Sequence, residues 1–259
     1  MAAIVQHLLA DGATAVSSVN LTNILAGQTG TALKFGIKNV GDRPLGNAFD
    51  SATNVTLSIG VVPGNDGSTR LRAALDTSGT ISPPWDLEAV LGPTADGGVW
   101  GATGQYGYVI VAVNGAGVTN ASDEVTVQVD DTTKRVTLTW AQVTGATGYR
   151  IYRTDTPGTY GASTLLTTIG SGATVTFIDD GSATSSGTPP VSNTTGGAAP
   201  AYGTPPAGLN TATSPFLIGQ DPGTLEVGEV AFYWVNRVVP SNSTPAGNPR
   251  SGRITVTEA

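Results

Sequence analysis

The feature that most constrains this chain is a succession of short segments in which apolar side chains recur at every second position. Two early examples span residues 33–37 and 55–61, and they end at the turn-forming runs 39–42 and 63–67. Such alternation between Gly, Pro, Asn and Asp residues predicts β-strands, and this spacing is typical of antiparallel sandwiches. No long helix is predicted, and residues 1–9 fit either one or two helical turns or an edge strand. Further predicted strands lie at 107–114, 123–130, 135–143, 148–154, 175–181, 229–239 and 252–259.

Two changes in composition divide the chain. Pro83 and Pro84 cannot lie inside a central strand, because proline has no backbone N–H to donate to a sheet. Residues 182–208 are rich in Pro, Gly, Ser and Thr, a composition typical of an extended linker. We therefore predict a middle domain at 86–182, a linker at 183–208, and an outer domain made of residues 1–85 and 209–259.

The middle domain carries four characteristic segments: VTLTW, which ends at Trp140, GATGYRIYR with Tyr149 and Tyr152, YGYVIVAVNGAG, and TFIDDG. In these segments it resembles a fibronectin type III domain. In that family the Trp packs in the core of a β-sandwich, so the resemblance implies a buried Trp140 with Tyr and Val side chains around it. It implies little about function, because one fold carries many functions.

The order of these segments departs from the family pattern. YGYVIVAVN and DEVTVQV normally come near the end of a fibronectin type III domain, whereas here both precede VTLTW. We interpret this order as a circular permutation closed by residues 125–136, which a sandwich with neighbouring termini tolerates. The alternative is that the two segments belong to a separate sheet.

The outer pieces carry LKFGIKNVGDRPL on one side of the middle domain and residues 224–256 on the other. The first segment is similar to the start of bacterial adhesion-type immunoglobulin-like modules, and the second is similar to their final strands, with Trp234 inward. The two pieces therefore resemble the two halves of one immunoglobulin-like sandwich. Neither piece has enough strands to close alone, so we expect the two pieces to pair. The predicted fold is thus all-β, with a fibronectin type III-like sandwich inserted in an immunoglobulin-like one. Modules with this small-residue composition are familiar in tailed-phage particles.

The predicted domains differ in charge. Residues 86–182 hold ten acids and four bases (−6), and the outer pieces hold nine acids and eight bases (−1). Arg is enriched at protein interfaces, so we expect the nearly neutral outer domain to dock and the acidic insert to project into solvent. Ordinary surface scatter is the alternative for any single Arg. The candidate docking residues are Arg237, Arg250, Arg253, Arg70 and Arg72.

The sequence carries no catalytic constellation. It has no cysteine and a single histidine, His7, so a thiolate site is excluded and a Ser-His-Asp triad would depend on His7. The neighbours in Asp130–Asp131 and in Asp179–Asp180 point to opposite faces of a strand, which disfavours an acid/base dyad. The run at 179–181 lacks the staggered pattern of a calcium loop. We therefore expect no enzyme activity, catalytic residue, cofactor or metal.

Aromatic residues outside the predicted strands give the main alternative function. Trp85, Trp100 and Tyr202 are candidate exposed aromatics, and rings of this kind stack on sugars. Their other role would be to seal domain junctions or subunit interfaces. The first residues lack a basic stretch before a long apolar core, so we expect no secretion signal.

Together these features predict a non-enzymatic virion structural protein of a bacteriophage, such as a capsid or tail decoration, neck or fibre-attachment component. We expect it to be assembled in the bacterial cytoplasm, to form a homo-oligomer and to pack on capsid or tail subunits. Neither nucleic acid nor membrane is an expected partner, because the chain is acidic and has no membrane-spanning apolar run. The alternative is a secreted or cell-surface carbohydrate-binding or adhesion module that binds a host-surface glycan.

Overall fold

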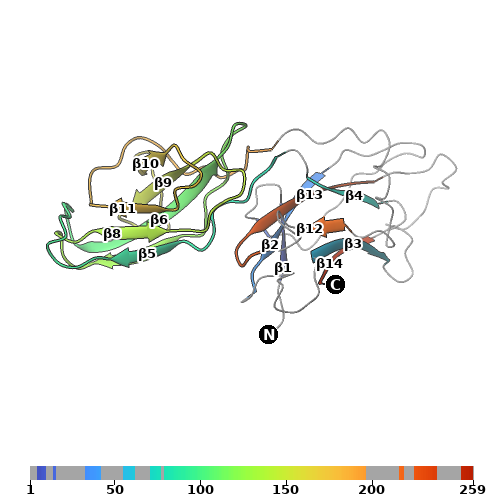
Figure 1. Ribbon diagram of the computed structural model, residues 1–259, viewed down its shortest axis with the longest axis horizontal. Coiled ribbons are helices and arrows are strands. Elements are labelled where there is room, and N and C mark those ends of the chain that lie inside the picture. Colours follow the sequence, from blue (N-terminus) through green and yellow to red (C-terminus); the bar gives the residue numbers. More distant parts are fainter. Residues whose placement is uncertain are drawn as a thin grey trace. The chain divides into compact units, whose positions relative to one another are not determined.

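The chain divides into two compact units. Unit 1 joins Met1–Ser78 with Gly197–Ala259, and unit 2 is Gly79–Gly196. The limits of unit 2 therefore lie outside those of the predicted insert, 86–182. The described part of the chain is all-β, with strands and turns and no helix (Figure 1). The computed structural model describes residues 5–9, 14–15, 33–41, 55–61, 71–76, 79–196, 216–218, 225–237 and 252–258.

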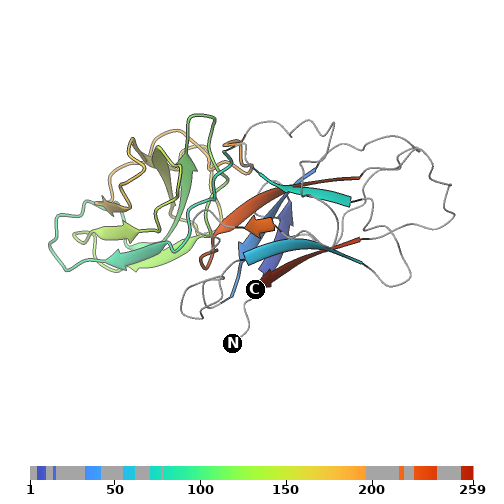
Figure 2. The same cartoon turned by 45° about the vertical axis from the view of Figure 1, so that its right-hand side comes forward.

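Unit 2 is a two-layer, sandwich-like arrangement of antiparallel sheets. Its strands are β5 (Glu88–Leu91), β6 (Gly104–Val113), β7 (Val125–Val129), β8 (Val136–Thr139), β9 (Gly148–Thr154), β10 (Leu165–Ile169) and β11 (Thr176–Asp179). One sheet has the order β10-β9-β6-β7 and the other β11-β8-β5. Figure 1 labels these strands, and Figure 2 shows the same cartoon turned by 45°. Strand β6 pairs with both β7 and β9. The YGYVIVAVN segment therefore shares a sheet with GYRIYRT and does not form a separate one.

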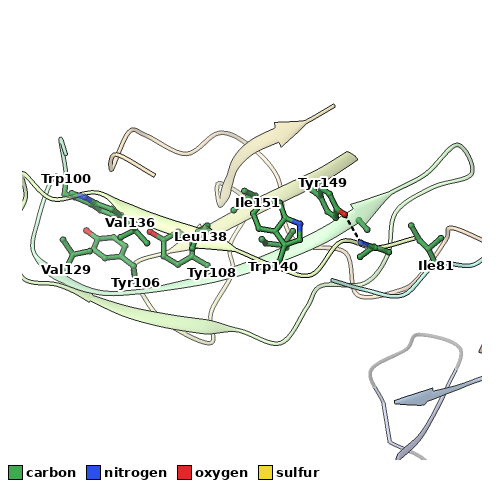
Figure 3. Close-up of a cluster of buried hydrophobic side chains, with 13 residues drawn as sticks. Ile81, Trp100, Tyr106, Tyr108, Val129, Val136, Leu138, Trp140, Tyr149 and Ile151 are labelled. Atoms are coloured by element: carbon green, nitrogen blue, oxygen red, sulfur yellow. Dashed lines mark hydrogen bonds between the residues drawn. The ribbon is translucent and has the colours of Figure 1, made fainter. Parts of the chain in front are cut away.

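The core of unit 2 lies between the two sheets. Trp140 follows β8 and is 4% exposed, which confirms its predicted burial. Its ring meets that of Tyr149 edge to face, with centroids 5.2 Å apart, and the Tyr149 hydroxyl accepts a hydrogen bond from the Val143 N–H at 3.0 Å (Figure 3). The buried cluster comprises Ile81, Trp100, Tyr106, Tyr108, Ile110, Ala112, Val129, Val136, Leu138, Trp140, Val143, Tyr149 and Ile151.

Residues 183–196, placed in a linker by their composition, belong to unit 2 instead. The Ser185 N–H donates to the Leu165 carbonyl at 2.7 Å, and the Thr194 N–H donates to the Val118 carbonyl at 2.8 Å. The segment has no regular strand, but the first residue of β10 and a loop of the same unit supply hydrogen-bond partners for it. Composition predicts irregular backbone correctly here, and it cannot reveal those partners.

Unit 1 also contains two sheets. Its strands are β1 (Val5–Leu9), β2 (Leu33–Asn39), β3 (Val55–Val61), β4 (Leu71–Leu75), β12 (Phe216–Ile218), β13 (Val230–Arg237) and β14 (Gly252–Glu258). The sheet orders are β1-β2-β13-β4 and β12-β3-β14. Each sheet thus combines strands that precede unit 2 in the sequence with strands that follow it. The N-terminal residues form an edge strand, β1, rather than helical turns.

Strand β13 is buried on both faces, because all residues from 230 to 235 are buried. One face carries Phe232, which clusters with Leu8. The other carries Tyr233, whose ring lies 5.7 Å from that of Phe35. Trp234 is 7% exposed, which confirms its predicted burial. A strand covered on both faces reads as a continuous apolar run, as this one does.

Candidate functional site

The structure does not gather the candidate docking arginines into one cluster within its described residues. Arg72 and Arg237 lie on the paired neighbouring strands β4 and β13. Arg253 lies on β14, in the other sheet of unit 1. Arg70 and Arg250 fall outside the described residues. The register pairs Arg72 with Asn236 and Arg237 with Leu71, so these two candidates lie on neighbouring strands without being direct partners, and Arg253 belongs to a different sheet.

Trp100 is buried, so its prediction as an exposed aromatic is wrong. The residue is 5% exposed, and its ring lies 4.5 Å from that of Tyr106. Its Nε1–H donates to the Lys134 carbonyl at 2.7 Å, which holds the indole under the loops at this end of the sandwich. Trp85 is half-buried and packs against the same core, and Tyr202 lies outside the described residues. Neither described candidate therefore offers a fully exposed ring for stacking on a sugar.

A buried ion pair joins the two sheets of unit 2. Arg153, on β9, donates from Nη1 to both carboxylate oxygens of Asp179, on β11, at 2.7 and 2.8 Å. The Tyr108 hydroxyl and the Gly181 N–H donate to the same carboxylate at 2.8 and 2.9 Å. The Arg153 guanidinium also lies 4.9 Å from the centre of the Trp100 ring. These four hydrogen bonds hold the Asp179 carboxylate in place between the two sheets.

The two adjacent carboxylates differ as the strand geometry predicts. Asp179 is buried, whereas Asp180 is partly exposed and accepts from the hydroxyl and N–H of Ser182, which lower the pKa of Asp180. Burial, followed by the charge of Asp179, raises the pKa of Tyr108 and keeps its hydroxyl a donor. The ion pair itself was not predicted. The sequence feature that could have indicated it is the alternation along β9, which places Arg153 on the same inward face as Ile151.

Unit 1 holds a second buried ion pair. Lys34 Nζ on β2 lies 2.9 Å from Asp76 Oδ2, just after β4, with side chains only 11% and 1% exposed. The Trp234 Nε1–H donates to the other oxygen, Oδ1, at 2.9 Å. Lys34 Nζ also lies 5.4 Å from the Phe232 ring centroid and 5.2 Å from that of Trp234. Both units therefore bury a cation and a carboxylate against aromatic rings.

Two further titratable groups of unit 1 are withdrawn from solvent. Glu229 is 7% exposed, its Oε2 accepts from the Glu226 N–H at 2.9 Å, and burial raises the pKa of Glu229 to about 7. His7 is half-buried with Nδ1 3.2 Å from the Tyr233 hydroxyl, and burial lowers the pKa of His7. Among the described residues no group of three or more His, Cys, Asp or Glu side chains could hold a metal ion. No helix in that part of the chain is long and apolar enough to cross a membrane.

The outward face of the β11-β8-β5 sheet carries an exposed row of β-branched side chains. Thr137 on β8 is the cross-strand partner of Val90 on β5 and of Ile178 on β11. Directly paired residues share a face, so the three side chains lie next to one another. Val90 is 59% exposed and Ile178 is 54% exposed. We call Val90, Thr137 and Ile178 the apolar row.

The charges beside the apolar row are mainly acidic. Glu88 is exposed two residues before Val90, and Asp180 lies two residues after Ile178. Arg135 is the basic neighbour at the Asp180 end of the row, and its charge contributes to the lowered pKa of Asp180. The sequence did not reveal this surface, because EAVL and TFID place apolar residues on both faces of their strands.

Searches for similar proteins returned no significant match to any family model, curated protein or solved structure.

Proposed function

We propose that the chain is a non-enzymatic structural protein of a tailed-phage particle that acts by packing on other virion subunits. In this proposal unit 1 is immunoglobulin-like and unit 2 is a permuted fibronectin type III-like insert. A four-stranded sheet facing a three-stranded one, with the β6–β7 hairpin ahead of β8, supports the permuted order.

The observation that carries the proposal is the apolar row. A solvent-facing sheet of a soluble sandwich normally places polar side chains outward, whereas Val90 and Ile178 stand exposed as cross-strand neighbours of Thr137. Exposed apolar surface of this kind marks interaction sites. Glu88 and Asp180 flank the row, so the fitting partner is a protein surface with an apolar centre and a Lys- or Arg-bearing rim.

The paired charges of the interior give the proposal a second support. Asp179 is committed to Arg153, and Asp76 is committed to Lys34 and Trp234. Each of these two carboxylates is held by fixed partners, an arrangement that suits a structural role. Arg72 and Arg237 lie on neighbouring strands of unit 1 but are offset by one residue in the register, so they stay separate docking candidates in this proposal.

The test is co-sedimentation of the labelled chain with purified virions from the source of the sequence. We expect saturable binding. The double variant Val90→Lys with Ile178→Lys should lower the binding affinity by about tenfold or more, because two charges would be buried against the partner. Val191→Lys is the matched control, because Val191 is 86% exposed in unit 2 and lies outside the apolar row.

Three outcomes would contradict the proposal. The unmodified chain does not sediment with virions, the row variant binds as well as the Val191 control, or a glycan array captures the chain while virions do not. The last result would establish the carbohydrate-binding alternative. Light scattering coupled to size exclusion, at several concentrations, measures in the same preparation whether the chain forms the proposed homo-oligomer.

A further inference from the structure

Asn114, in the turn directly after β6, binds both ends of unit 2. Its Nδ2 donates to the Gly79 carbonyl at 3.1 Å and to the Thr195 carbonyl at 2.9 Å. Gly79 is the first residue of unit 2, and Thr195 is the last but one. A single side-chain amide therefore joins the segment through which the chain enters the unit to the segment through which it leaves.

The two segments also bind each other. We call residues 79–81 the entry segment and residues 193–195 the exit segment. The Ile81 N–H donates to Thr195 Oγ1 at 3.0 Å, and Asn193 Nδ2 donates to the Ile81 carbonyl at 2.9 Å. Ile81 and Thr195 are buried. The Asn114 amide thus belongs to a hydrogen-bonded cluster, and a chemical change at this amide acts on both segments.

Asn114 is the one asparagine in the chain that glycine follows. The backbone nitrogen after an asparagine can attack the side-chain Cγ, and glycine hinders this attack least because it has no Cβ. Gly115 is exposed, and a Cβ built on it would meet no atom within 4 Å. From this arrangement we propose that Asn114 is a deamidation site, and that its modification releases the entry and exit segments from the turn.

The turn leaves the nucleophile accessible and polarises the electrophile. Among the described residues the Gly115 N–H has no hydrogen-bond partner, so hydroxide can remove its proton. Asn114 Oδ1 accepts from the Ala116 N–H at 2.9 Å and from the Gly117 N–H at 3.0 Å. Two donors on this oxygen stabilise the negative charge that develops on it during the attack, as in an oxyanion hole.

The bonds of Nδ2 make the modification depend on opening of the cluster. This nitrogen must leave the Gly79 and Thr195 carbonyls before it departs as ammonia, so the rate follows the local opening of the two segments. The product cannot restore the contacts. A carboxylate oxygen is an acceptor only, and it would face two carbonyl oxygens that have lost their donor.

The reaction consumes one water molecule and releases one ammonia. The bond from Gly115 N to Asn114 Cγ forms and the Cγ–Nδ2 bond breaks, and the proton of the Gly115 N–H leaves with the nitrogen as ammonia. Water then opens the resulting succinimide. Cleavage on the side-chain carbonyl gives aspartate, and cleavage on the main-chain carbonyl gives isoaspartate. No electron is gained or lost.

The deciding experiment is peptide mapping by mass spectrometry of the purified full chain, incubated for several weeks at mildly alkaline pH. We expect the peptide that contains Asn114 to gain the mass that separates a carboxyl group from an amide, and part of the product to be isoaspartate. Asn120 and Asn193 are internal controls in the same unit, because Ala121 and Thr194 follow them and carry a Cβ. They should react more slowly.

Gly115→Ala is the matched variant. Gly115 is not among the glycines with a positive φ, and a Cβ has room there, so this variant should fold normally and deamidate more slowly. An original chain that stays unmodified at Asn114 would overturn the proposal. So would equal rates in the original chain and in Gly115→Ala, because the attack would then not come from the Gly115 nitrogen.

Asn114→Asp imitates the product and tests the release of the two segments. We expect amide hydrogen exchange at Ile81 to become about tenfold faster or more, because the cluster that holds this N–H opens more often. Unchanged exchange at Ile81 would refute the release. The inference concerns unit 2 alone and does not depend on the proposed function, since virion binding is measured separately.

Discussion

Asp179→Ala tests whether the buried ion pair holds the two sheets of unit 2 together. The substitution removes the acceptor of two hydrogen bonds from Arg153, one from Tyr108 and one from the Gly181 N–H. Arg153, which is 9% exposed, would keep its charge with no carboxylate to balance it. Removing one partner of a buried pair costs about 3–5 kcal/mol, and we expect the free energy of unfolding of unit 2 to fall by that amount.

The assay is urea unfolding followed by tryptophan fluorescence. Trp100 is a local reporter, because the Arg153 guanidinium lies 4.9 Å from its ring centroid. The companion variant replaces both charges, Arg153→Met with Asp179→Leu, and therefore leaves no unpaired charge in the core. We expect it to be more stable than Asp179→Ala and to lie within about 2 kcal/mol of the original chain.

Either of two results would refute this reasoning. If Asp179→Ala costs less than about 1 kcal/mol, water must reach Arg153 and the pair is not buried in the sense that the geometry implies. If the double variant is as unstable as the single one, the lost stability comes from altered packing of the core rather than from the unpaired charge of Arg153.

Three other predictions concern the core, a buried acid and the boundary between the units. Trp140→Ala should cost unit 2 about 3–5 kcal/mol by urea unfolding, and an unchanged midpoint would show that the ring does not pack in the core. Because burial raises the pKa of Glu229 from 4.5 to about 7, the folded chain binds a proton more tightly than the unfolded one, and unit 1 should lose stability as pH rises between about 4.5 and 7. Glu229→Gln should abolish that slope and stabilise unit 1 at pH 8 by on the order of 2–3 kcal/mol, whereas equal slopes in the two chains would assign the effect elsewhere. Replacing residues 80–195 with a short Gly/Ser bridge should leave unit 1 folded, and a circular dichroism spectrum without β-structure would show that its sheets need unit 2.

The all-β class and most strand positions follow from the sequence, because period-two alternation and turn residues are local properties of the backbone. The burial of Trp140 and Trp234 was predicted, and both are buried. The separation of Asp179 from Asp180 onto opposite faces also follows from strand geometry alone. The strand positions and the two faces of the Asp pair are decided within a few residues, whereas the burial of the two Trp residues was predicted from the resemblance to known sandwiches.

The tertiary structure decided which residues far apart along the chain become contact partners. Composition made residues 183–196 a linker, yet loops more than twenty residues distant hold part of that segment. Trp100 was a candidate exposed aromatic because it lies outside the predicted strands, and it is buried because its ring packs on Tyr106 and its Nε1–H donates to the Lys134 carbonyl. The ion pairs of Asp179 with Arg153 and of Asp76 with Lys34 each join strands that only the fold brings together. A sequence pattern records the side of a strand on which a residue lies, whereas the free energy of burying a charge or an aromatic ring depends on what faces that side.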